Sequence, residues 1–245
     1  MNRVLSECFP EIRAGGFTRN DGTIQFYQRI QALLRPDDVV LDFGAGRGAA
    51  HVLEPDSYRT RLRNLRGQGR HVVGVDPDEA VKLNRSLDDV AVLDPAAALP
   101  FADGTFDIIV SDFVFEHIAD GRRIAEELGR VLKRSGWICA RTPNRFGYVA
   151  IANSLLPDRV GGIVLRAAQP ERKQEDVFPT LYRMNTLRTI RALFPTDCYE
   201  HASFSYDSEP RYYFNSGVVL RCLSFIQNLT PSGLKTTLMC FMRKL

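Results

Sequence analysis

The chain has 245 residues, of which 44% are hydrophobic and 25% charged, and its formal net charge is +3. This is the composition of an ordinary globular protein, and we expect residues 1–245 to form one domain. Because nucleic-acid binders concentrate basic residues on one face, a net charge this small gives no strong nucleic-acid signal.

Charged residues and a proline interrupt the first sixteen residues, and the chain contains no run of 18 apolar residues. We therefore expect neither a secretory signal nor a transmembrane segment. The cysteines are odd in number, widely spaced and without a zinc-ligand pattern: Cys8, Cys139, Cys198, Cys222 and Cys240. Reduced thiols, a cytoplasmic location and no metal site are the corresponding expectations.

From residue 29 to 141, short β-branched runs alternate with longer segments of helical periodicity, which is typical of βαβ units around a parallel sheet. Strands are predicted at residues 39–41, 72–75, 90–93, 106–110 and 137–140. The clearest helix carries one apolar stripe, formed by Ile124, Leu128, Val131 and Leu132, and residues 133–136 mark its end with two cations and a glycine.

The last hundred residues are less regular. Asn185 can cap one helix, and Asn215 or Ser216 can cap another. Residues 236–241 suit a final edge strand, and for the apolar stretch 218–242 a core helix plus this strand is favoured over contact with a membrane surface. We expect residues 147–245 to supply the substrate or lid region and the last strands.

The segment from Asp42 to Gly48, with sequence DFGAGRG, lies between a predicted strand and a predicted helix. Its glycines permit positive φ and let a ligand approach the backbone, which indicates a nucleotide-like ligand. Gly44, Gly46 and Ala49 also satisfy the G-x-G-x-x-A fingerprint of dinucleotide-binding oxidoreductases. The turn alone therefore leaves two classes of ligand open.

Acidic residues end the first three predicted strands. Asp42 would repel a pyrophosphate but would suit a cofactor with a cationic amino group. Asp76 could accept hydrogen bonds from both hydroxyls of a ribose, and Asp94 could accept one from an adenine amino group. Asp42 and Asp94 thus disfavour a nicotinamide cofactor.

Four motifs in this order resemble class I S-adenosylmethionine-dependent methyltransferases: VLDFGAGRG at 40–48, GVD at 74–76, LPFADGTFDIIV at 99–110 and EH at 116–117. In particular the chain is similar to the methyltransferase type 11-like bacterial subgroup that modifies glycans and small molecules. The resemblance covers about residues 30–146. It implies a doubly wound α/β fold, a Rossmann-like three-layer sandwich whose seven-stranded, mostly parallel sheet has an antiparallel last strand.

The resemblance also implies S-adenosyl-L-methionine as the cofactor. Asp42 would face its methionine end, Asp76 its ribose and Asp94 its adenine. The other residues expected to bind the cofactor are Gly44, Ala45, Gly46, Gly48, Pro77, Asp112 and Phe113, of which the last two would line the methyl-transfer end. One departure from the family pattern is the long interval before Asp76, because residues 54–71 insert extra residues.

The insertion contains five arginines without an acid between Tyr58 and His71: Arg59, Arg61, Arg63, Arg66 and Arg70. A solvated basic helix is the favoured interpretation, because runs of like charge are usually solvated. The alternative is recognition of a phosphate on a nucleotide sugar, a lipid carrier or an RNA.

The catalytic residue is left open, with His117 and Asp112 as candidates for a general base. His117 could equally cap a helix or pack against the cofactor loop, and Asp112 is favoured as a cofactor contact. Arg141 and Asn144, after the fifth strand, are candidate substrate contacts because ligands bind at the carboxyl ends of parallel strands. The segment 176–185, aromatic and polar together, suits a lid.

The expected function is methyl transfer from S-adenosylmethionine to a glycan or other small-molecule acceptor. The alternatives are an NAD(P)-binding oxidoreductase, an RNA methyltransferase and a non-catalytic cofactor-binding scaffold. The acceptor atom and the oligomeric state are left open by the sequence.

Overall fold

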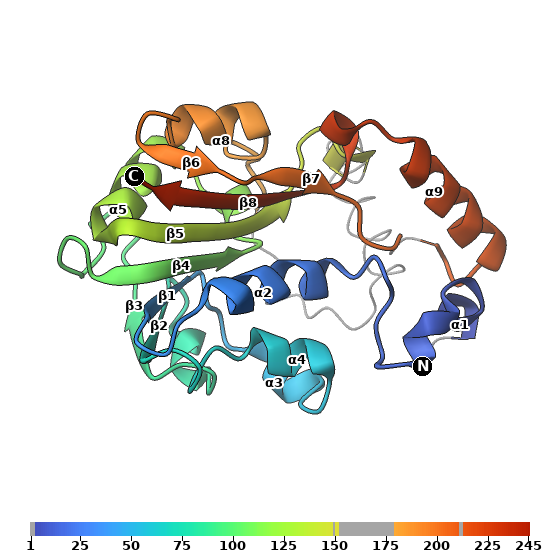
Figure 1. Cartoon of the computed structure of the whole chain (residues 1–245), viewed down its shortest axis with the longest axis horizontal. Coiled ribbons are helices and arrows are strands. Elements are labelled where there is room, and N and C mark those ends of the chain that lie inside the picture. Colours follow the sequence, from blue (N-terminus) through green and yellow to red (C-terminus); the bar gives the residue numbers. More distant parts are fainter. Residues whose placement is uncertain (1–2, 149, 152–178, 211–212) are drawn as a thin grey trace.

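The computed structural model describes residues 3–148, 150–151, 179–210 and 213–245 (Figure 1). Its centre is an eight-stranded sheet with the strand order β3-β2-β1-β4-β5-β8-β6, in which β7 also pairs with β8. The strands are β1 (Val39–Phe43), β2 (His71–Asp76), β3 (Asp89–Val92), β4 (Phe106–Asp112), β5 (Leu132–Pro143), β6 (Tyr199–His201), β7 (Phe204–Tyr206) and β8 (Thr237–Lys244). All five strands predicted between residues 39 and 140 are confirmed.

Strands β1 to β5 pair in parallel, and β8 runs antiparallel to β5, β6 and β7. The expected arrangement is therefore present, with one difference in strand number: the outermost strand is divided into β6 and β7. At the break, the Ala202 amide donates to the Phe241 carbonyl at 2.9 Å, and the Ser203 hydroxyl accepts from the Phe241 amide at 3.1 Å. The Ser203 hydroxyl thus takes the place of a backbone carbonyl as the acceptor for β8 at this point.

The prediction of an edge strand at 236–241 is wrong, because β8 lies inside the sheet between β5 and the β6–β7 pair. The physical reason is visible in the sequence of β8. Its residues Thr237 to Met242 are all buried, whichever face of the sheet they point to. Continuous burial on both faces is typical of an interior strand rather than of an edge.

Helices cover both faces of the sheet, which confirms the three-layer arrangement (Figure 1). The helices are α1 (Arg3–Cys8), α2 (Gly22–Leu33), α3 (Ala49–Leu53), α4 (Tyr58–Arg63), α5 (Gly121–Val131), α8 (Leu187–Leu193) and α9 (Gly217–Leu229). Short 3-10 turns are η1 (Pro10–Arg13), η2 (Glu79–Leu83), η3 (Phe115–His117) and η5 (Ser232–Leu234). One core contains Leu128 and Phe194 from α5 and the end of α8; the other contains Phe26 and Ile30 from α2.

Helix α5 contains the predicted stripe as far as Val131 and ends earlier than predicted. The Asp120 side chain accepts from the Arg123 amide at 3.1 Å and caps the first turn. The last helical residue is Val131, and Leu132 already belongs to β5, whose Lys133 ammonium lies 2.7 Å from the Asp107 carboxylate. Lys133 and Arg134, the two cations predicted to mark the end of the helix, therefore belong to strand β5. Asp107 on β4 holds Lys133 in this strand.

The cap predictions for the C-terminal helices have two outcomes. Thr186, not Asn185, caps α8 by accepting from the Thr189 amide at 3.0 Å. Asn185 is buried instead and donates to the Thr142 hydroxyl at 2.7 Å. Ser216 caps α9, which confirms one of the two predicted alternatives.

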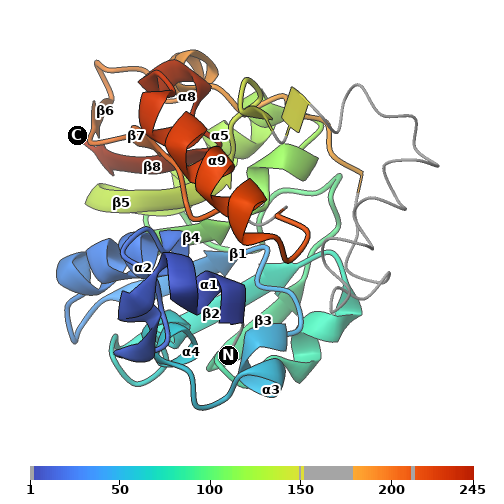
Figure 2. The ribbon, with the colours of Figure 1, turned by 90° about the vertical axis from the view of Figure 1, so that its right-hand side faces the viewer.

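The prediction of a core helix within 218–242 is wrong. Helix α9 buries only Leu220 and packs against α1 rather than against the sheet. Both helices lie beyond the carboxyl ends of the parallel strands, and Figure 2 views this end directly, with α1 and α9 in front of β1 and β4. In the ranges that the structure describes, no helix combines the length and the apolar content needed to cross a bilayer.

Candidate functional site

The glycine turn leaves β1 at its carboxyl end and is held against β2. The amides of Gly44 and Ala45 both donate to the Val75 carbonyl, at 2.8 and 3.1 Å. Gly44 has a φ of +80°, and a Cβ added to it would lie 2.3 Å from the Val114 side chain. Gly46 also has positive φ, +52°, but a Cβ there would meet nothing within 4 Å among the described residues. The turn is thus tight on one side and leaves open space beside Gly46.

Asp76 connects the glycine turn to the end of β2. Its Oδ2 atom accepts from the Gly46 amide at 2.9 Å, and its Oδ1 atom accepts from the Asp78 amide at 2.8 Å. The residue is buried, and each carboxylate oxygen retains acceptor capacity after these bonds. A ligand with two adjacent hydroxyls could donate to these two acceptor oxygens.

Asp42, at the end of β1, lies among other acids. Burial, followed by the nearby charges of Asp112 and Asp76, raises the pKa of Asp42 to about 7. The positive charge of Arg63 opposes this rise. Because a nearby cation would favour the ionised carboxylate, the region beside Asp42 suits a cationic ligand group.

Asp112, at the end of β4, is bound on two sides. The Arg141 guanidinium donates to Oδ1 and Oδ2, each at 2.7 Å, and the Tyr27 hydroxyl donates to Oδ2 at 3.1 Å. Burial alone would raise the pKa of Asp112, but Arg141, together with Arg63 and the Tyr27 hydroxyl, holds that pKa below its usual value. The next residue, Phe113, has a φ of +60°, and its ring centroid lies 4.7 Å from the Arg141 guanidinium carbon.

The arginine insertion forms the short helix α4, and two of its arginines turn toward the site. Arg59 pairs with Asp21, the N-cap of α2, and an Arg63 Nη atom lies 3.7 Å from the Asp112 carboxylate. The interpretation as a solvated basic helix is therefore wrong for these two residues. Acids distant in sequence, which no local charge pattern reveals, hold them inward.

One hydrogen-bond donor of the Arg63 side chain is unusual for a buried polar group. Its Nε atom is buried and has no hydrogen-bond partner among the described residues. Its guanidinium carbon lies 5.8 Å from the Tyr27 ring centroid, so the arginine covers that tyrosine at the carboxyl end of the sheet. A buried donor without a partner is costly, and an anionic ligand group would satisfy it.

The other residues expected at the cofactor lie at the same edge. Gly48 caps α3 with a φ of +68°, and the Asn84 side-chain amide donates to the Ala45 carbonyl at 3.1 Å. Pro77 is exposed directly after Asp76. Asp94 is exposed beyond β3, where it accepts from the Ala96 amide at 2.8 Å. Asn84 is a contributor that the sequence analysis missed, because its role depends on contact with a turn 38 residues away.

The turn after β4 carries His117 and Glu116. The His117 ring nitrogen Nδ1 lies 2.8 Å from the Pro179 carbonyl, so the ring is tied to the segment before α8. Glu116 is buried, its Oε2 atom accepts from the Thr142 hydroxyl at 2.8 Å, and burial raises its pKa. Its own carbonyl accepts from the Leu181 amide at 2.6 Å.

Beside this turn is a pocket of about 310 Å³, lined by Arg145, Phe146, Ala150, Ile151, Leu181 and Tyr182. Asn144, a candidate substrate contact, is buried and does not line it; its side-chain amide donates to the Gly233 and Lys235 carbonyls at 2.9 and 2.7 Å. Arg141, the other candidate, is occupied by Asp112. Within the predicted lid 176–185, residues 176–178 lie outside the described residues.

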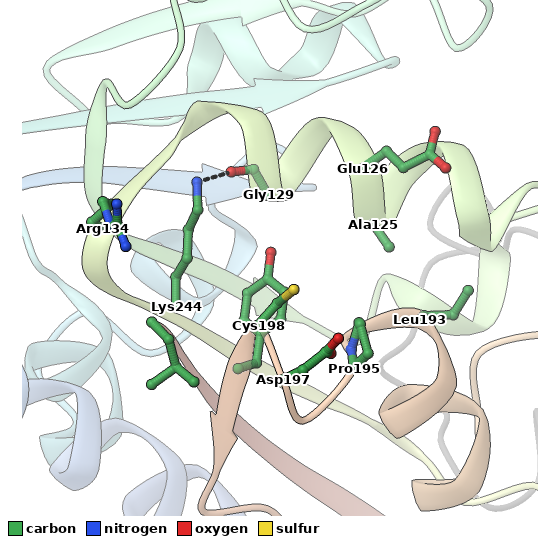
Figure 3. A pocket seen from close by; sticks show the side chains of 11 residues that line it. Ala125, Glu126, Gly129, Arg134, Leu193, Pro195, Asp197, Cys198 and Lys244 are labelled. Atoms are coloured by element: carbon green, nitrogen blue, oxygen red, sulfur yellow. Dashed lines mark hydrogen bonds between the residues drawn. The ribbon is translucent and has the colours of Figure 1, made fainter.

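A larger depression, of about 600 Å³, lies at the opposite end of the sheet (Figure 3). Arg134 lines it at the start of β5, and Lys244 lines it near the end of the antiparallel β8, where its ammonium donates to the Gly129 carbonyl at 2.7 Å. Ligands of parallel α/β sheets bind at the carboxyl ends of the strands, so this depression is not the candidate site. No group of three or more potential metal ligands is found among the described residues.

A parallel sheet with one antiparallel strand beside β5, and an acid followed by a glycine turn after β1, define the class I S-adenosylmethionine-dependent methyltransferase fold. Residues 41–140 match the family model described as "Methyltransferase domain". This part of the chain therefore carries a methyltransferase domain, and S-adenosyl-L-methionine is the cofactor that the names of its relatives indicate.

Relatives agree with this assignment. A probable S-adenosylmethionine-dependent methyltransferase of Mycobacterium tuberculosis is 35% identical over 125 residues, covering 50% of this chain and 41% of that protein. A sarcosine/dimethylglycine N-methyltransferase of Halorhodospira halochloris is 29% identical over 116 residues, covering 46% and 40%. The chain thus matches about two fifths of the length of these curated relatives.

Solved structures of methyltransferases have a similar fold. A SAM-dependent methyltransferase of Thermotoga maritima, described as a possible histamine N-methyltransferase, has a TM-score of 0.54 at 14% identity. The match covers 100% of this chain and 98% of that one. At this identity the likeness concerns the fold.

Proposed function

We propose that the protein transfers a methyl group from S-adenosylmethionine to a small-molecule or glycan acceptor. When bound, the cofactor supplies a methyl group made electrophilic by its sulfonium. The observation that carries the proposal is the pair of acids beside the glycine turn, Asp42 and Asp76, with open space next to Gly46. A nucleoside with a cationic side chain matches that combination.

Asp76 holds the ribose in this proposal. Each of its oxygens already accepts one backbone hydrogen bond, which fixes the carboxylate while leaving acceptor capacity for two hydroxyls. Gly44, Ala45, Gly46 and Gly48 form the surface under the cofactor, and Pro77 and Asp94 lie toward its adenine. Such charge-assisted hydrogen bonds are stronger than neutral ones.

In this proposal, Asp42 and Arg63 bind the two charged groups at the methionine end of the cofactor. That end carries both an ammonium and a carboxylate. Asp42 attracts the ammonium, and ionises more readily when it does so. The Arg63 Nε atom, which has no hydrogen-bond partner among the described residues, donates to the carboxylate in this proposal, so that one arginine of the insertion would belong to the cofactor site.

Asp112 positions the methyl-transfer end and does not take a proton. Both of its oxygens accept from Arg141, and its pKa is lowered, which makes it a poor base. Phe113 lines the same end. His117, tied to Pro179, is the remaining candidate base for an acceptor that must lose a proton.

The acceptor binds in the pocket of about 310 Å³ next to the His117 turn. This volume is at the lower limit of ordinary small-molecule sites. Phe146 and Tyr182 offer aromatic surface on which a sugar or a small amine can stack, and Arg145 offers a positive charge at the rim. The size favours a small acceptor over a polynucleotide.

The paired state of the insertion also disfavours the RNA alternative. Arg59 is engaged by Asp21, and Arg66 lies 2.8 Å from the Asp88 carboxylate. Arginines neutralised by acids of the same chain are poor phosphate ligands, because binding would first have to break these pairs.

Calorimetric titration with S-adenosylhomocysteine and, separately, NADH tests the cofactor class. We expect binding of the first and none of the second; the reverse result would establish the oxidoreductase alternative. Labelled S-adenosylmethionine is then incubated with a panel of sugars, small amines and other metabolites. Cofactor binding without transfer to any member of a broad panel would favour the non-catalytic scaffold.

A further inference from the structure

Helix α9 presents an apolar stripe to solvent. Val218, Phe225, Ile226 and Leu229 are between 56% and 73% exposed, and Cys222 is exposed between them. At 100° per residue these five side chains fall within an arc of about 100° along three helical turns. Helices of globular proteins normally direct such a stripe toward the core. In α9 the core-facing position is held by Leu220 alone.

Exposed apolar side chains are also concentrated elsewhere at this end of the molecule. They come from α3, from the turn after β4, from the segment after β5 and from the segment before α8: Val52, Leu53, Phe113, Phe146, Ile151 and Leu181. With α9, five separate parts of the chain carry exposed apolar side chains. Exposed apolar residues on several segments suit an extended apolar partner better than a single docked peptide.

The charge around α9 favours an anionic partner. Residues 213–236, which include α9, contain no Asp or Glu but contain the cations Arg221 and Lys235. Arg221 is exposed on α9 itself, at the flank of the stripe. A second copy of the chain would bring Arg221 against another helix that lacks acids, which is unfavourable. An anionic lipid surface would complement the cations and bury the apolar side chains.

We propose that α9 lies on the surface of an anionic lipid membrane, with Phe225 and its neighbours in the interfacial region and the carboxyl edge of the sheet facing the lipid. The helix of 13 residues is about 20 Å long, and it lies along the surface rather than across it. Since the candidate acceptor pocket opens at the same edge, the membrane would present acceptors that carry an apolar tail.

Two exposed cysteines provide a matched pair of reporters. Cys222 lies within the stripe, whereas Cys198 lines the depression at the opposite end of the sheet (Figure 3). One variant carries Cys8→Ser and Cys198→Ser, the other Cys8→Ser and Cys222→Ser. Cys139 and Cys240 are buried and remain unlabelled. Each variant receives an environment-sensitive fluorophore and is mixed with vesicles of phosphatidylcholine and phosphatidylglycerol.

We expect a blue shift, and quenching by a lipid-attached quencher, from the label at Cys222 only. In flotation assays of the unlabelled protein, we expect Phe225→Gln to lower vesicle partitioning roughly tenfold or more. The variant puts a polar side chain where the membrane-bound protein would bury a phenylalanine in lipid. Leu245→Gln, an exposed apolar residue at the opposite end, leaves partitioning unchanged. High salt weakens the binding.

Three results would overturn the proposal: no vesicle-dependent change, equal changes at Cys222 and Cys198, or a dimer in light scattering that Phe225→Gln dissociates. The last result would assign the stripe to a second copy of the chain. Vesicle binding is measured without cofactor, and S-adenosylhomocysteine titration of the same samples reports separately on the proposed function.

Discussion

Arg141 and Asp112 face each other across β5 and β4 and are joined by two hydrogen bonds of 2.7 Å, with the arginine side chain only 2% exposed. Arg141 also donates to the Thr23 hydroxyl at 3.2 Å, and Tyr27 donates to Asp112. The ion pair therefore joins two strands to α2 directly below the candidate methyl-transfer end.

Replacing Arg141 with methionine leaves Asp112 buried without its cationic partner. We expect the free energy of unfolding to fall by about 3–5 kcal/mol, which is the usual cost of removing one member of a buried pair. The double variant Arg141→Met/Asp112→Leu removes both charges and recovers most of this loss. Chemical denaturation gives the free energy of unfolding of the wild type, the single variant and the double variant. A single variant as stable as the wild type would contradict the structural role of the Arg141–Asp112 pair.

The affinity for S-adenosylhomocysteine depends on pH through Asp42. Since the pKa of Asp42 is about 7 in the cofactor-free protein, the carboxylate is protonated below that pH and ionised above it. The α-amino group of the ligand stays cationic over the pH range around this pKa, because it belongs to a free amino acid whose carboxylate is ionised. We therefore expect affinity to rise as pH increases from about 5.5 to about 7.5, by at most tenfold per pH unit.

Asp42→Asn is the control for this pH dependence, because it keeps the size of the side chain and removes the titration. Asp76, Asp112 and Arg63 face the same group and are unchanged in the variant. Its affinity is expected to be lower above pH 7 and nearly flat with pH. A variant that keeps the full wild-type slope would assign the titration to another group.

Arg63→Met tests the role of the insertion in cofactor binding. S-adenosylhomocysteine keeps the amino-acid carboxylate of the cofactor, whereas 5′-methylthioadenosine lacks the whole amino-acid part. We expect the variant to bind the first ligand about 10- to 100-fold more weakly and the second unchanged, because only the carboxylate contact is lost. Equal losses for both ligands would indicate a general disturbance of the site.

Asp76→Ala weakens binding of both ligands in the same assay, because each contains the ribose. The expected loss is about 2–3 kcal/mol, since charge-assisted hydrogen bonds to two hydroxyls disappear. The variant also frees the Gly46 amide, so circular dichroism must first establish that it is folded. Unchanged affinity in a folded variant would exclude Asp76 from the ribose site.

His117→Ala is expected to keep measurable turnover once an acceptor is known, because alignment with a reactive sulfonium supplies most of the rate. A general base contributes about 10²–10⁴-fold, so a loss below about tenfold assigns His117 to support of the segment at Pro179. The pH profile is the second measurement. A loss above a hundredfold, together with loss of one limb of the pH profile, would make His117 the base.

The strands around the site could be predicted from the sequence because their signals are local. Each is a short apolar run bounded by a turn, and the acids and glycines that follow are fixed by position along the chain. Once the parallel order is known, the carboxyl ends of β1 and β2 must bring Asp42 and Asp76 to one edge. Periodicity and the resemblance therefore sufficed for this half of the site.

The tertiary structure decided which charges are paired and which apolar side chains are covered. Asp112 meets Arg141 29 residues away and Tyr27 85 residues away, and Arg59 meets Asp21 38 residues away. Helix α9 has the apolar stripe of a core helix, but that stripe faces outward, because packing partners and not periodicity determine which face is buried. The sequence by itself determined the elements and the glycine turn, whose hydrogen bonds and sterics are local, whereas long-range contacts decided the environment of each side chain.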